Sequence, residues 1–408
     1  MIITRTLVFR AKLSRATHTA LEAFLEEMRV LWNAALEERI DAYRKAGVSI
    51  SWVDQFKSLT EIRRTLPEYS RCSVTAQRSV LKRLDHAFQG FFRRNAAGSK
   101  PGFPRFRSRN RGVRSFEMPV PTIRKKGRWN TIAVKGIGRF RFAGKIEGDP
   151  KVLRIVKSPR RVTVQVVVER EAPEAVDTRR PIGIDAGIVH RAALSTGETV
   201  PGRKLDRTIL VKRQRKLSRA KRGSRSRCKK RLALAKAWQL VKENDRGMLH
   251  ELTAKLVRDH GARFYVEDLK IPNLLRNRHL ARSIAEQNWG TFVSLLTYKA
   301  EEAGGWVRKV PPHHTSQLCS DCGSMPEKRL TLAERTYRCA SCGNVEDRDV
   351  NAAKNILQVG LTLHPPGGAL PGAPGGGRQR SAGRKVGLCV TARNSVESLA
   401  ALAVKCSL

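Results

Sequence analysis

The feature that most constrains the fold is a short apolar run that carries a single carboxylate. Residues 181–198 read PIGIDAGIVHRAALSTGE, in which β-branched and small apolar residues surround Asp185 and two glycines bend the chain. Such a run predicts a buried strand that turns back into a second strand. Because an unpaired charge inside a buried strand is costly, Asp185 needs a partner.

Two further acidic sites lie far along the chain. Residues 263–269, RFYVEDL, include Glu267 near the end of a short apolar run, and residues 346–357, EDRDVNAAKNIL, place Asp349 at the start of an expected helix. If these acids and Asp185 converge, two carboxylates about 4 Å apart repel by about 4 kcal/mol at an effective dielectric near 20. Paired Mg²⁺ ions relieve such repulsion in carboxylate-lined nuclease sites. We therefore predict a metal-dependent phosphodiester site.

Two neighbouring acids compete for these roles. Asp268 follows Glu267 directly, and Asp347 precedes Asp349 by two residues. We prefer Asp349 because it begins the expected helix, where it is predicted to cap the helix and face the strands. Asp347 is the fallback, and three ordinary surface or capping acids are the alternative interpretation.

The charge balance indicates a polyanionic partner. The 408 residues contain 80 Lys and Arg against 36 Asp and Glu, a net charge of +44. Such an imbalance destabilises a compact protein by self-repulsion unless a polyanion neutralises it. With 40% hydrophobic residues the chain can fill cores, so disorder alone does not explain the charge. No apolar run reaches about eighteen residues, and Arg5 and Arg10 interrupt any signal-peptide core, so we expect neither membrane association nor export.

Hydrophobic periodicity divides the chain into segments of different class. Residues 2–13 alternate as a strand, and helical spacing follows in three runs, over residues 21–40, 56–66 and 80–92. Short β-patterned runs over residues 113–169 predict a small β-barrel or sandwich that includes the first strand, with the helices inserted. A further helix is expected over residues 283–303, ended by two glycines. From about residue 361 the chain is too rich in Gly and Pro to pack.

Two basic segments are candidate nucleic-acid contacts rather than a flexible linker and a solvated helix face. In residues 98–111, GSKPGFPRFRSRNR, phenylalanines that can stack on bases alternate with arginines that can bind phosphates. Residues 212–231 hold twelve Lys and Arg and no acid, and these like charges repel along a helix unless a phosphate backbone binds them. The candidates are Phe103, Arg105, Phe106, Arg107, Arg109, Lys212, Arg213, Arg215, Lys216, Arg219 and Arg222.

Two C-x-x-C pairs predict a zinc site. Cys319 and Cys322 form the first pair and Cys339 and Cys342 the second, with sixteen residues between the pairs. This is the spacing of a four-cysteine zinc site, whereas a thioredoxin-like redox pair explains only one C-x-x-C. Because sulfur fills all four ligand positions, the predicted metal is structural rather than catalytic. The scattered Cys72, Cys228, Cys389 and Cys406 receive no role.

These motifs resemble the TnpB family, the RNA-guided nucleases of insertion sequences and relatives of the compact type V CRISPR effectors. The resemblance covers roughly residues 17–357 in the family's motif order. The matching segments are GFPRFRSR (Gly102–Arg109), GIDAGI (Gly183–Ile188), VEDLKIPNL (Val266–Leu274), NWGTFVSLLTYKAEEAG (Asn288–Gly304), TSQLCSDCG (Thr315–Gly323), CASCG (Cys339–Gly343) and DRDVNAAKNI (Asp347–Ile356).

The resemblance implies a multidomain α/β fold. An RNase H-like (RuvC) nuclease domain with an inserted four-cysteine zinc ribbon is expected, together with an N-terminal β-barrel that contains an inserted helical recognition lobe. The implied boundaries are 1–15 and 111–175 for the wedge-like barrel, 16–110 for the helical lobe, 176–310 and 346–358 for the nuclease domain, 311–345 for the ribbon and 359–408 for a disordered tail.

The resemblance also implies the site and its partners. Asp185, Glu267 and Asp349 are the expected Mg²⁺ ligands, for two ions, and Arg335 is the expected contact to the scissile phosphate. The expected activity is cleavage of double-stranded DNA beside a short transposon-associated motif, with base pairing to a guide RNA from the transposon end selecting the target. A monomer on one RNA is expected, in the cytoplasm of a prokaryote at the nucleoid. The alternatives are an RNA-guided repressor without cleavage and a DNA transposase.

The sequence departs from the family pattern at two places. The Tyr-Pro pair usual after the first strand is absent near residues 11–15, and Glu346 replaces a frequent histidine before the DRD motif. The first departure bears on recognition of the DNA motif, and neither affects the three acids.

Overall fold

The computed structural model describes residues 2–365 except 101, 110–111, 172, 174–176, 313–314, 328–329 and 331–333. The described residues form two compact units, residues 2–171 and residues 173–365. The predicted tail over 359–408 lies outside the described residues from residue 366 on. Its first part is not a tail, because residues 359–363 are the end of a helix.

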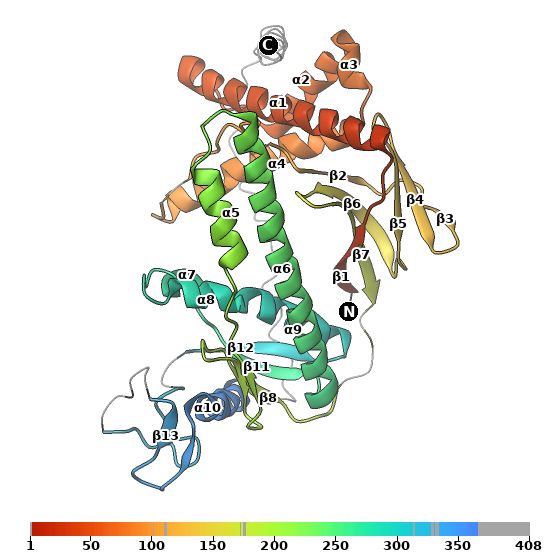
Figure 1. Ribbon diagram of the computed structural model, residues 1–408. Helices are drawn as coiled ribbons and strands as arrows, with labels where there is room; N and C mark the ends of the chain where they lie inside the picture. Colours follow the sequence, from red (N-terminus) through yellow and green to blue (C-terminus); the bar gives the residue numbers. More distant parts are fainter. Residues whose placement is uncertain are drawn as a thin grey trace. The chain divides into compact units, whose positions relative to one another are not determined.

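The N-terminal unit places four helices between its first strand and the rest of its strands (Figure 1). Its elements are β1 (Ile2–Arg10), α1 (Arg15–Ala46), α2 (Trp52–Thr65), α3 (Pro67–Ser70), α4 (Val74–Ala96), β2 (Ser115–Pro119), β3 (Arg124–Lys126), β4 (Trp129–Val134), β5 (Gly138–Ala143), β6 (Asp149–Lys157) and β7 (Val162–Glu171).

Antiparallel pairing brings the two ends of this unit together. The four-stranded sheet has the order β1-β7-β6-β2, so the first strand joins this sheet, as predicted, and its partner is the last strand of the unit. Strands β3, β4 and β5 form a separate sheet, which an isolated bridge between Lys12 and Arg141 links to the segment after β1. Apolar residues from both sheets and from α1 and α4 share one core. The predicted barrel and its boundaries stay a prediction.

The helices of this unit follow the predicted apolar spacing. In α1 the side chains of Leu21, Phe24 and Met28 are buried and belong to the core shared with the sheets. The helix begins at the N-cap Ser14, whose side chain accepts a hydrogen bond from the Thr17 backbone N–H, and ends at Gly47, whose φ of 65° lies in the left-handed region. These local signals explain why the helix has these bounds.

The C-terminal unit alternates strands and helices. Its elements are β8 (Ile182–Asp185), β9 (His190–Leu194), β10 (Thr199–Pro201), α5 (Thr208–Ser218), α6 (Arg225–His260), β11 (Arg263–Glu267), α7 (Ile271–Leu274), α8 (Ala281–Gln287), α9 (Trp289–Glu302), β12 (Trp306–Val310), β13 (Thr336–Arg338), β14 (Val345–Asp347) and α10 (Arg348–Leu363).

A mixed five-stranded sheet organises this unit. Its order is β10-β9-β8-β11-β12, with antiparallel pairing from β10 to β8 and parallel pairing from β8 to β12. The buried strand that turns back into a second one is therefore confirmed as β8 and β9. Helices α6 and α9 share a core with the sheet, and α10 packs against β8 (Figure 1).

The predicted helix over 283–303 is wrong in one respect, because two helices occupy this range. Asn288 separates α8 from α9 with a φ of 56° in the left-handed region. Its side-chain amide donates to Asp245 Oδ2 at 2.9 Å, and the Thr291 hydroxyl donates to Asn288 Oδ1 at 2.7 Å. These bonds hold a backbone conformation that asparagine tolerates better than most residues. Hydrophobic spacing alone does not reveal such a break.

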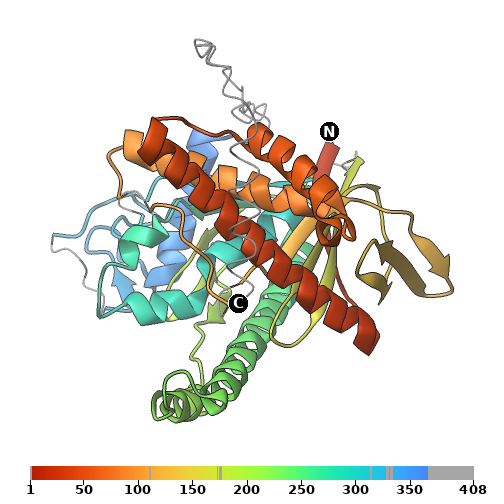
Figure 2. The same ribbon diagram turned by 90° about the horizontal axis from the view of Figure 1, so that it is seen from above.

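Helices α5 and α6 form a hairpin that carries the basic segment. Figures 1 and 2 show α5 beside the N-terminal half of α6. The Arg227 guanidinium donates to the carbonyl oxygens of Leu217 and Ala220 at 2.9 and 2.8 Å, which fixes the turn between the helices. No helix among the described residues, including the 36-residue α6, is long and apolar enough to cross a membrane.

We expect Gly183→Ala to destabilise the protein by about 3 kcal/mol, at the upper end of overpacking costs. A Cβ atom at this position would lie 2.1 Å from the Ala353 carbonyl oxygen and 2.7 Å from the Leu357 backbone nitrogen, so β8 and α10 would have to separate. Urea unfolding measures the effect. The matched control is Gly247→Ala in α6, where a Cβ meets nothing within 4 Å, and it should stabilise by up to about 1 kcal/mol.

Candidate active site and metal centre

The carboxyl ends of two parallel strands bring two of the predicted acids together. Asp185 is the last residue of β8, and Glu267 is the last residue of β11. Ile184 pairs with Val266 in parallel register, so the acids follow at the same level of the sheet. Both are half-buried. The neighbouring Asp268 is held instead by Lys270 and Lys309, at 2.6 and 3.1 Å.

Helix α10 carries the third predicted acid to the same place. Asp349 lies in its first turn and is buried. Burial, followed by the carboxylates of Glu267 and Asp349, raises the pKa of Asp185 well above its usual range. Burial also raises the pKa of Glu267, against the effect of a hydrogen bond that Thr315 donates to Glu267 Oε1 at 3.1 Å. The three acids therefore share one electrostatic environment.

This donor set fits hard divalent cations. Carboxylate oxygens are the ligands that Mg²⁺ prefers. Burial raises the pKa of both Asp185 and Glu267, and the carboxylates of Glu267 and Asp349 add to the effect on Asp185, so a bound cation would favour the ionised carboxylates. The ligand atoms of Asp185, Glu267 and Asp349 do not all lie within 4.8 Å of one another.

The predicted capping role of Asp349 is wrong, because Asp347 caps α10. The Oδ1 atom of Asp347 accepts hydrogen bonds from the backbone N–H groups of Asp349 and Val350, at 2.8 and 3.2 Å. With the cap supplied two residues earlier, the Asp349 carboxylate is left for other partners. Asp347, the fallback choice, thus fixes the start of α10, and Asp349, the preferred choice, is the acid that raises the pKa of Asp185.

Two basic side chains contact the Asp349 carboxylate. His190, the first residue of β9, has Nδ1 3.0 Å from Asp349 Oδ2. Arg335, the expected phosphate contact, has NH1 3.7 Å from Asp349 Oδ1 and is about half exposed. Sequence reasoning missed His190, since the residue lies in a run interpreted only as a strand and no spacing motif includes it.

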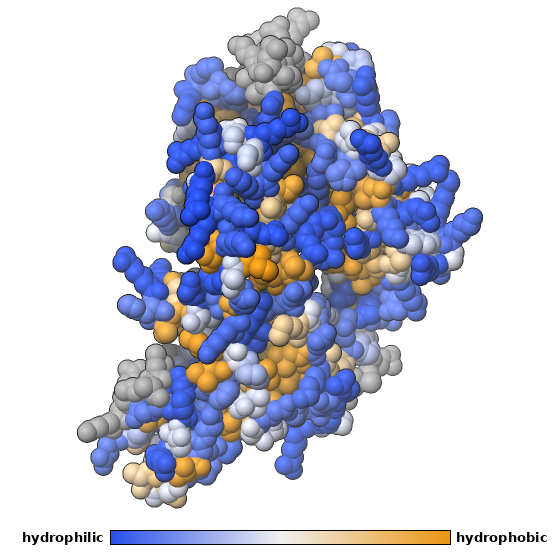
Figure 3. Space-filling view, viewed as in Figure 1, coloured by the Kyte–Doolittle hydropathy of each residue, from blue (hydrophilic) through white to orange (hydrophobic). Residues whose placement is uncertain are grey.

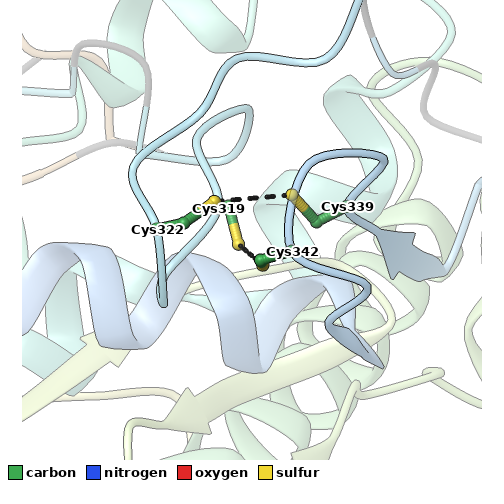
Figure 4. A group of neighbouring side chains, drawn as sticks. All are labelled: Cys319, Cys322, Cys339 and Cys342. Carbon is green, nitrogen blue, oxygen red and sulfur yellow. Dashed lines mark hydrogen bonds between the residues drawn. The ribbon is translucent and has the colours of Figure 1, made fainter.

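The four cysteines form a compact cluster (Figure 4). Sγ atoms are 3.6 Å apart in the pairs Cys319–Cys342 and Cys322–Cys339, and all four sulfurs lie within 4.8 Å of one another. Tetrahedral zinc with Zn–S bonds of about 2.3 Å requires sulfurs about 3.8 Å apart. The cluster therefore fits a structural zinc ion.

The two cysteine pairs have the same local structure. Gly323 donates its backbone N–H to the Cys319 carbonyl oxygen at 3.0 Å, and Gly343 does the same to Cys339 at 3.1 Å. Both glycines have a φ near 75°, which favours glycine. The glycine after each C-x-x-C is thus explained by the turn that folds the thiols toward one point. His313 and His314, which the sequence sets apart from this site, lie outside the described residues.

The cysteine cluster is tied to α10 and to Glu267. Asn351 of α10 accepts a hydrogen bond from the Ser320 backbone N–H and donates to the Leu318 carbonyl oxygen, each at 2.8 Å. Asn355 donates to the carbonyl oxygens of Thr315 and Leu318. Since Thr315 also donates to Glu267, the segment before Cys319 links the third-acid helix to the second acid.

The first basic segment has a partly structural role. The Arg107 guanidinium lies 4.0 Å from the centre of the Trp32 ring, and its backbone is bound by Asn33 through two hydrogen bonds. Phe103 packs edge-on against Phe88 and Phe91 of α4. Arg107 and Phe103 therefore hold the segment against the helices. The side chains of Arg105, Phe106 and Arg109 are exposed to solvent.

The second basic segment lines a groove on α5. A hollow of about 660 Å³ is bordered by Arg207, Thr208, Val211, Lys212, Arg215, Lys216 and Arg219. Hydrophilic side chains gather over this helix in the space-filling view (Figure 3). Arg213 points to α6 instead, where it donates to the Ala233 carbonyl oxygen. Arg222 is exposed in the turn before α6.

Comparison with known proteins places the chain in a family. A family model described as "Cas12f1-like, TNB domain" matches residues 289–356, and one described as "Probable transposase" (OrfB_IS605) matches residues 163–278. Cas12f1 of Sulfoacidibacillus thermotolerans, a CRISPR-associated endodeoxyribonuclease, is 27% identical over 44% of this chain and 46% of its own. The solved Cas12f1-sgRNA-target DNA complex matches 87% of this chain and 98% of that one, at 16% identity and with a TM-score of 0.31.

Two relatives match over most of their length. InsQ of Escherichia coli K12, named "Putative RNA-guided DNA endonuclease", is 29% identical over 83% of this chain and 88% of its own. A protein of Streptomyces pristinaespiralis with the same description is 34% identical over 344 residues, 82% of this chain and 84% of its own. The chain therefore belongs to the TnpB family of transposon-associated RNA-guided DNA endonucleases.

Proposed function

We propose that this chain, an RNA-guided DNA endonuclease of an insertion sequence, cuts double-stranded DNA beside a short transposon-associated motif. The observation that carries the proposal is that three acids from distant segments lie at the carboxyl ends of two neighbouring strands, near enough for two of them to raise the pKa of the third. Asp185 and Glu267 end parallel strands, and Asp349 comes from the helix that packs across them. The order of the mixed sheet, an antiparallel meander continued by parallel strands, supports a RuvC-like assignment.

We further propose that Asp185, Glu267 and Asp349 hold two Mg²⁺ ions. When bound, the ions activate a water molecule and stabilise the leaving oxygen of the phosphodiester. The protein's own part is to hold the three carboxylates near one another, and oriented, against their mutual repulsion. Thr315 fixes one Glu267 oxygen, and Asp347 frees Asp349 by capping the helix. Arg335 lies next to Asp349 and is half exposed, which supports its proposed role as the contact to the scissile phosphate.

The zinc site has a structural role in this proposal. Four sulfur ligands leave no open coordination position, so zinc supplies folding energy rather than chemistry. Asn351 and Asn355 of α10 hydrogen-bond to the backbone around Cys319, so the folded ribbon also holds α10 in position. The ribbon thereby supports the orientation of the third acid.

Guide RNA and target DNA are the proposed partners of the basic surfaces. We propose one protein copy on one RNA, acting in the cytoplasm of a prokaryote at the nucleoid; the two relatives that match over most of their length come from bacteria, Streptomyces pristinaespiralis and Escherichia coli. The exposed Lys212, Arg215 and Arg219 line one groove with no acid among its lining residues, which suits a phosphate backbone.

Replacing Lys212, Arg215 and Arg219 together with glutamine should weaken binding of the guide RNA and flatten its salt dependence. Each lost contact to single-stranded phosphate lowers the slope of log K against log salt by about 0.7, so the triple variant should lose about 2. Filter binding over a salt series measures the slope. The control replaces Lys145, Lys151 and Lys255, which lose the same charge but already pair with acids, and its slope should stay near that of the wild type.

A programmed-cleavage experiment tests the function. The protein is purified with its co-expressed RNA, the bound small RNA is sequenced, and the guide segment is replaced by a new sequence. With Mg²⁺ present, double-strand cuts should move to duplexes matching the new guide. Binding without cutting would indicate a repressor, and strand-transfer products would indicate a transposase.

A further inference from the structure

We propose that His190 is a positioning residue for the metal ligand Asp349, acting as the hydrogen-bond donor that fixes this carboxylate's orientation. The inference deepens the proposed function and rests on it. His190 Nδ1 lies 3.0 Å from Asp349 Oδ2, which is a hydrogen-bonding distance. A carboxylate oxygen accepts hydrogen bonds, so the proposed contact uses the form of the imidazole that carries a proton on Nδ1. The opposite oxygen, Oδ1, then remains on the side of Arg335.

Asp347 is the competing partner of the imidazole, and the distances exclude it. His190 Nδ1 lies 3.9 Å from Asp347 Oδ1, beyond hydrogen-bonding range. That oxygen already accepts from the backbone N–H groups of Asp349 and Val350. The three side chains nevertheless form a tight group, with ligand atoms all within 4.8 Å. The geometry therefore makes Asp349, rather than Asp347, the acceptor of the hydrogen bond from His190.

The residues on both sides of His190 are held by hydrogen bonds. The neighbouring Arg191 is 4% exposed, and its guanidinium donates to the Gln287 carbonyl oxygen at 2.9 Å and to Asp245 at 2.8 Å. Gly202 donates its N–H to the Val189 carbonyl oxygen, and a Cβ there would lie 2.0 Å from the Ile188 carbonyl oxygen. These contacts fix the strand start from which the imidazole projects.

Gly187 provides the space that this arrangement needs. A Cβ at Gly187 would lie 2.9 Å from the His190 carbonyl oxygen and 3.4 Å from Asp349 Oδ2. The Trp289 indole N–H donates to the Gly187 carbonyl oxygen at 3.2 Å, which holds the loop between β8 and β9. One short loop thus joins Asp185 to His190 and leaves room for the carboxylate of Asp349 beside it.

The role follows from how metal ligands are held. Side chains that hydrogen-bond a metal ligand fix its orientation, and their removal typically costs about 10–100-fold in metal affinity or activity. Magnesium prefers oxygen ligands, so the imidazole serves this site better as a donor to the carboxylate than as a direct ligand. Two matched variants separate these roles. Asparagine places an N–H near the position of Nδ1, whereas phenylalanine keeps the ring volume and has no donor.

Iron-induced backbone cleavage provides a readout that does not depend on DNA cutting. The protein carrying its guide RNA is titrated with Fe²⁺ in the presence of ascorbate and peroxide, and fragments cut near Asp185, Glu267 and Asp349 are quantified. His190→Phe should raise the Fe²⁺ concentration for half-maximal fragmentation by about 10–100-fold. His190→Asn should stay within about threefold of the wild type. Melting temperatures without metal check that both variants fold.

Cleavage of matched DNA gives the second readout. His190→Phe should raise the Mg²⁺ concentration for half-maximal rate, with the rate at saturating Mg²⁺ within about threefold of the wild type. Unchanged Fe²⁺ titration in His190→Phe, or equal losses in both variants, would overturn the donor role and leave the proposed function intact. Absence of fragments near the three acids in the wild type would overturn the metal site and this inference with it.

Discussion

Asp185→Asn is expected to slow cleavage of guide-matched DNA by about a thousandfold or more while binding of RNA and DNA is retained. Metal ions contribute several kcal/mol to stabilising a phosphodiester transition state, and each 1.4 kcal/mol corresponds to about a tenfold change in rate. Burial and the carboxylates of Glu267 and Asp349 raise the pKa of Asp185 well above its usual range, so Asp185 is the acid that a cation would stabilise most. Single-turnover cleavage and filter binding measure the two effects separately.

Asp268→Asn is the matched control for this loss. Asp268 follows Glu267 directly, but Lys270 and Lys309 neutralise it at 2.6 and 3.1 Å. Its cleavage rate should remain within a small factor of the wild type. A thousandfold loss in both variants, or in neither, would contradict the assignment of Asp185 as a metal ligand.

The same Asp185→Asn substitution should stabilise the metal-free protein. A raised carboxyl pKa means that the native state binds more protons than the unfolded chain, so native stability falls as pH rises through the raised pKa. Asparagine does not ionise, so the variant does not lose this stability as the pH rises. The melting temperature at neutral pH in chelator should therefore rise, and the difference should vanish below about pH 4, the ordinary pKa of aspartate.

Cys339→Ser is the second substitution with a large expected effect. Structural zinc in small domains supplies on the order of 10 kcal/mol of folding free energy. Losing one of four sulfurs should release zinc, expose residues 315–347 to protease and reduce cleavage, because Asn351 and Asn355 of α10 hydrogen-bond to this region. Zinc content by mass spectrometry, limited proteolysis and cleavage rate are measured on the same preparation.

Cys228→Ser is the control for the zinc prediction. Cys228 is an exposed thiol in α6, outside the cysteine cluster. This variant should keep its zinc, its protease resistance and its activity. If Cys339→Ser also kept one zinc per chain and full activity, the four-sulfur site would be contradicted.

Local patterns predicted the parts of the fold that local interactions determine. The apolar spacing in α1, the strand turning back after Asp185 and the glycine after each cysteine pair all depend on neighbours within a few residues. The three acids could be chosen because each stands at the end of an apolar run or at a helix start. Their convergence depends on the register of β8 with β11 and on Gly183 under α10, which the sequence alone does not reveal.

Contacts between distant residues account for three of the features that sequence reasoning missed or misassigned, and a local contact accounts for a fourth. The break at Asn288 is held by Asp245, 43 residues away, and His190 meets Asp349 across 159 residues. The structural use of Arg107 depends on Trp32 of α1, so its alternation with phenylalanine suggested only a nucleic-acid contact. The capping role of Asp347 differs from that expected of Asp349 by only two residues, a shift that composition cannot distinguish.

Metal density in the assembled complex tests the central claim most directly. The protein with guide RNA and matched duplex is imaged in Ca²⁺, which binds carboxylate sites at about 2.3–2.6 Å. We predict two density peaks about 3.5–4 Å apart, bound by oxygens of Asp185, Glu267 and Asp349 beside the target strand. Peaks bound by other residues, or none among these three carboxylates with DNA in place, would contradict the account.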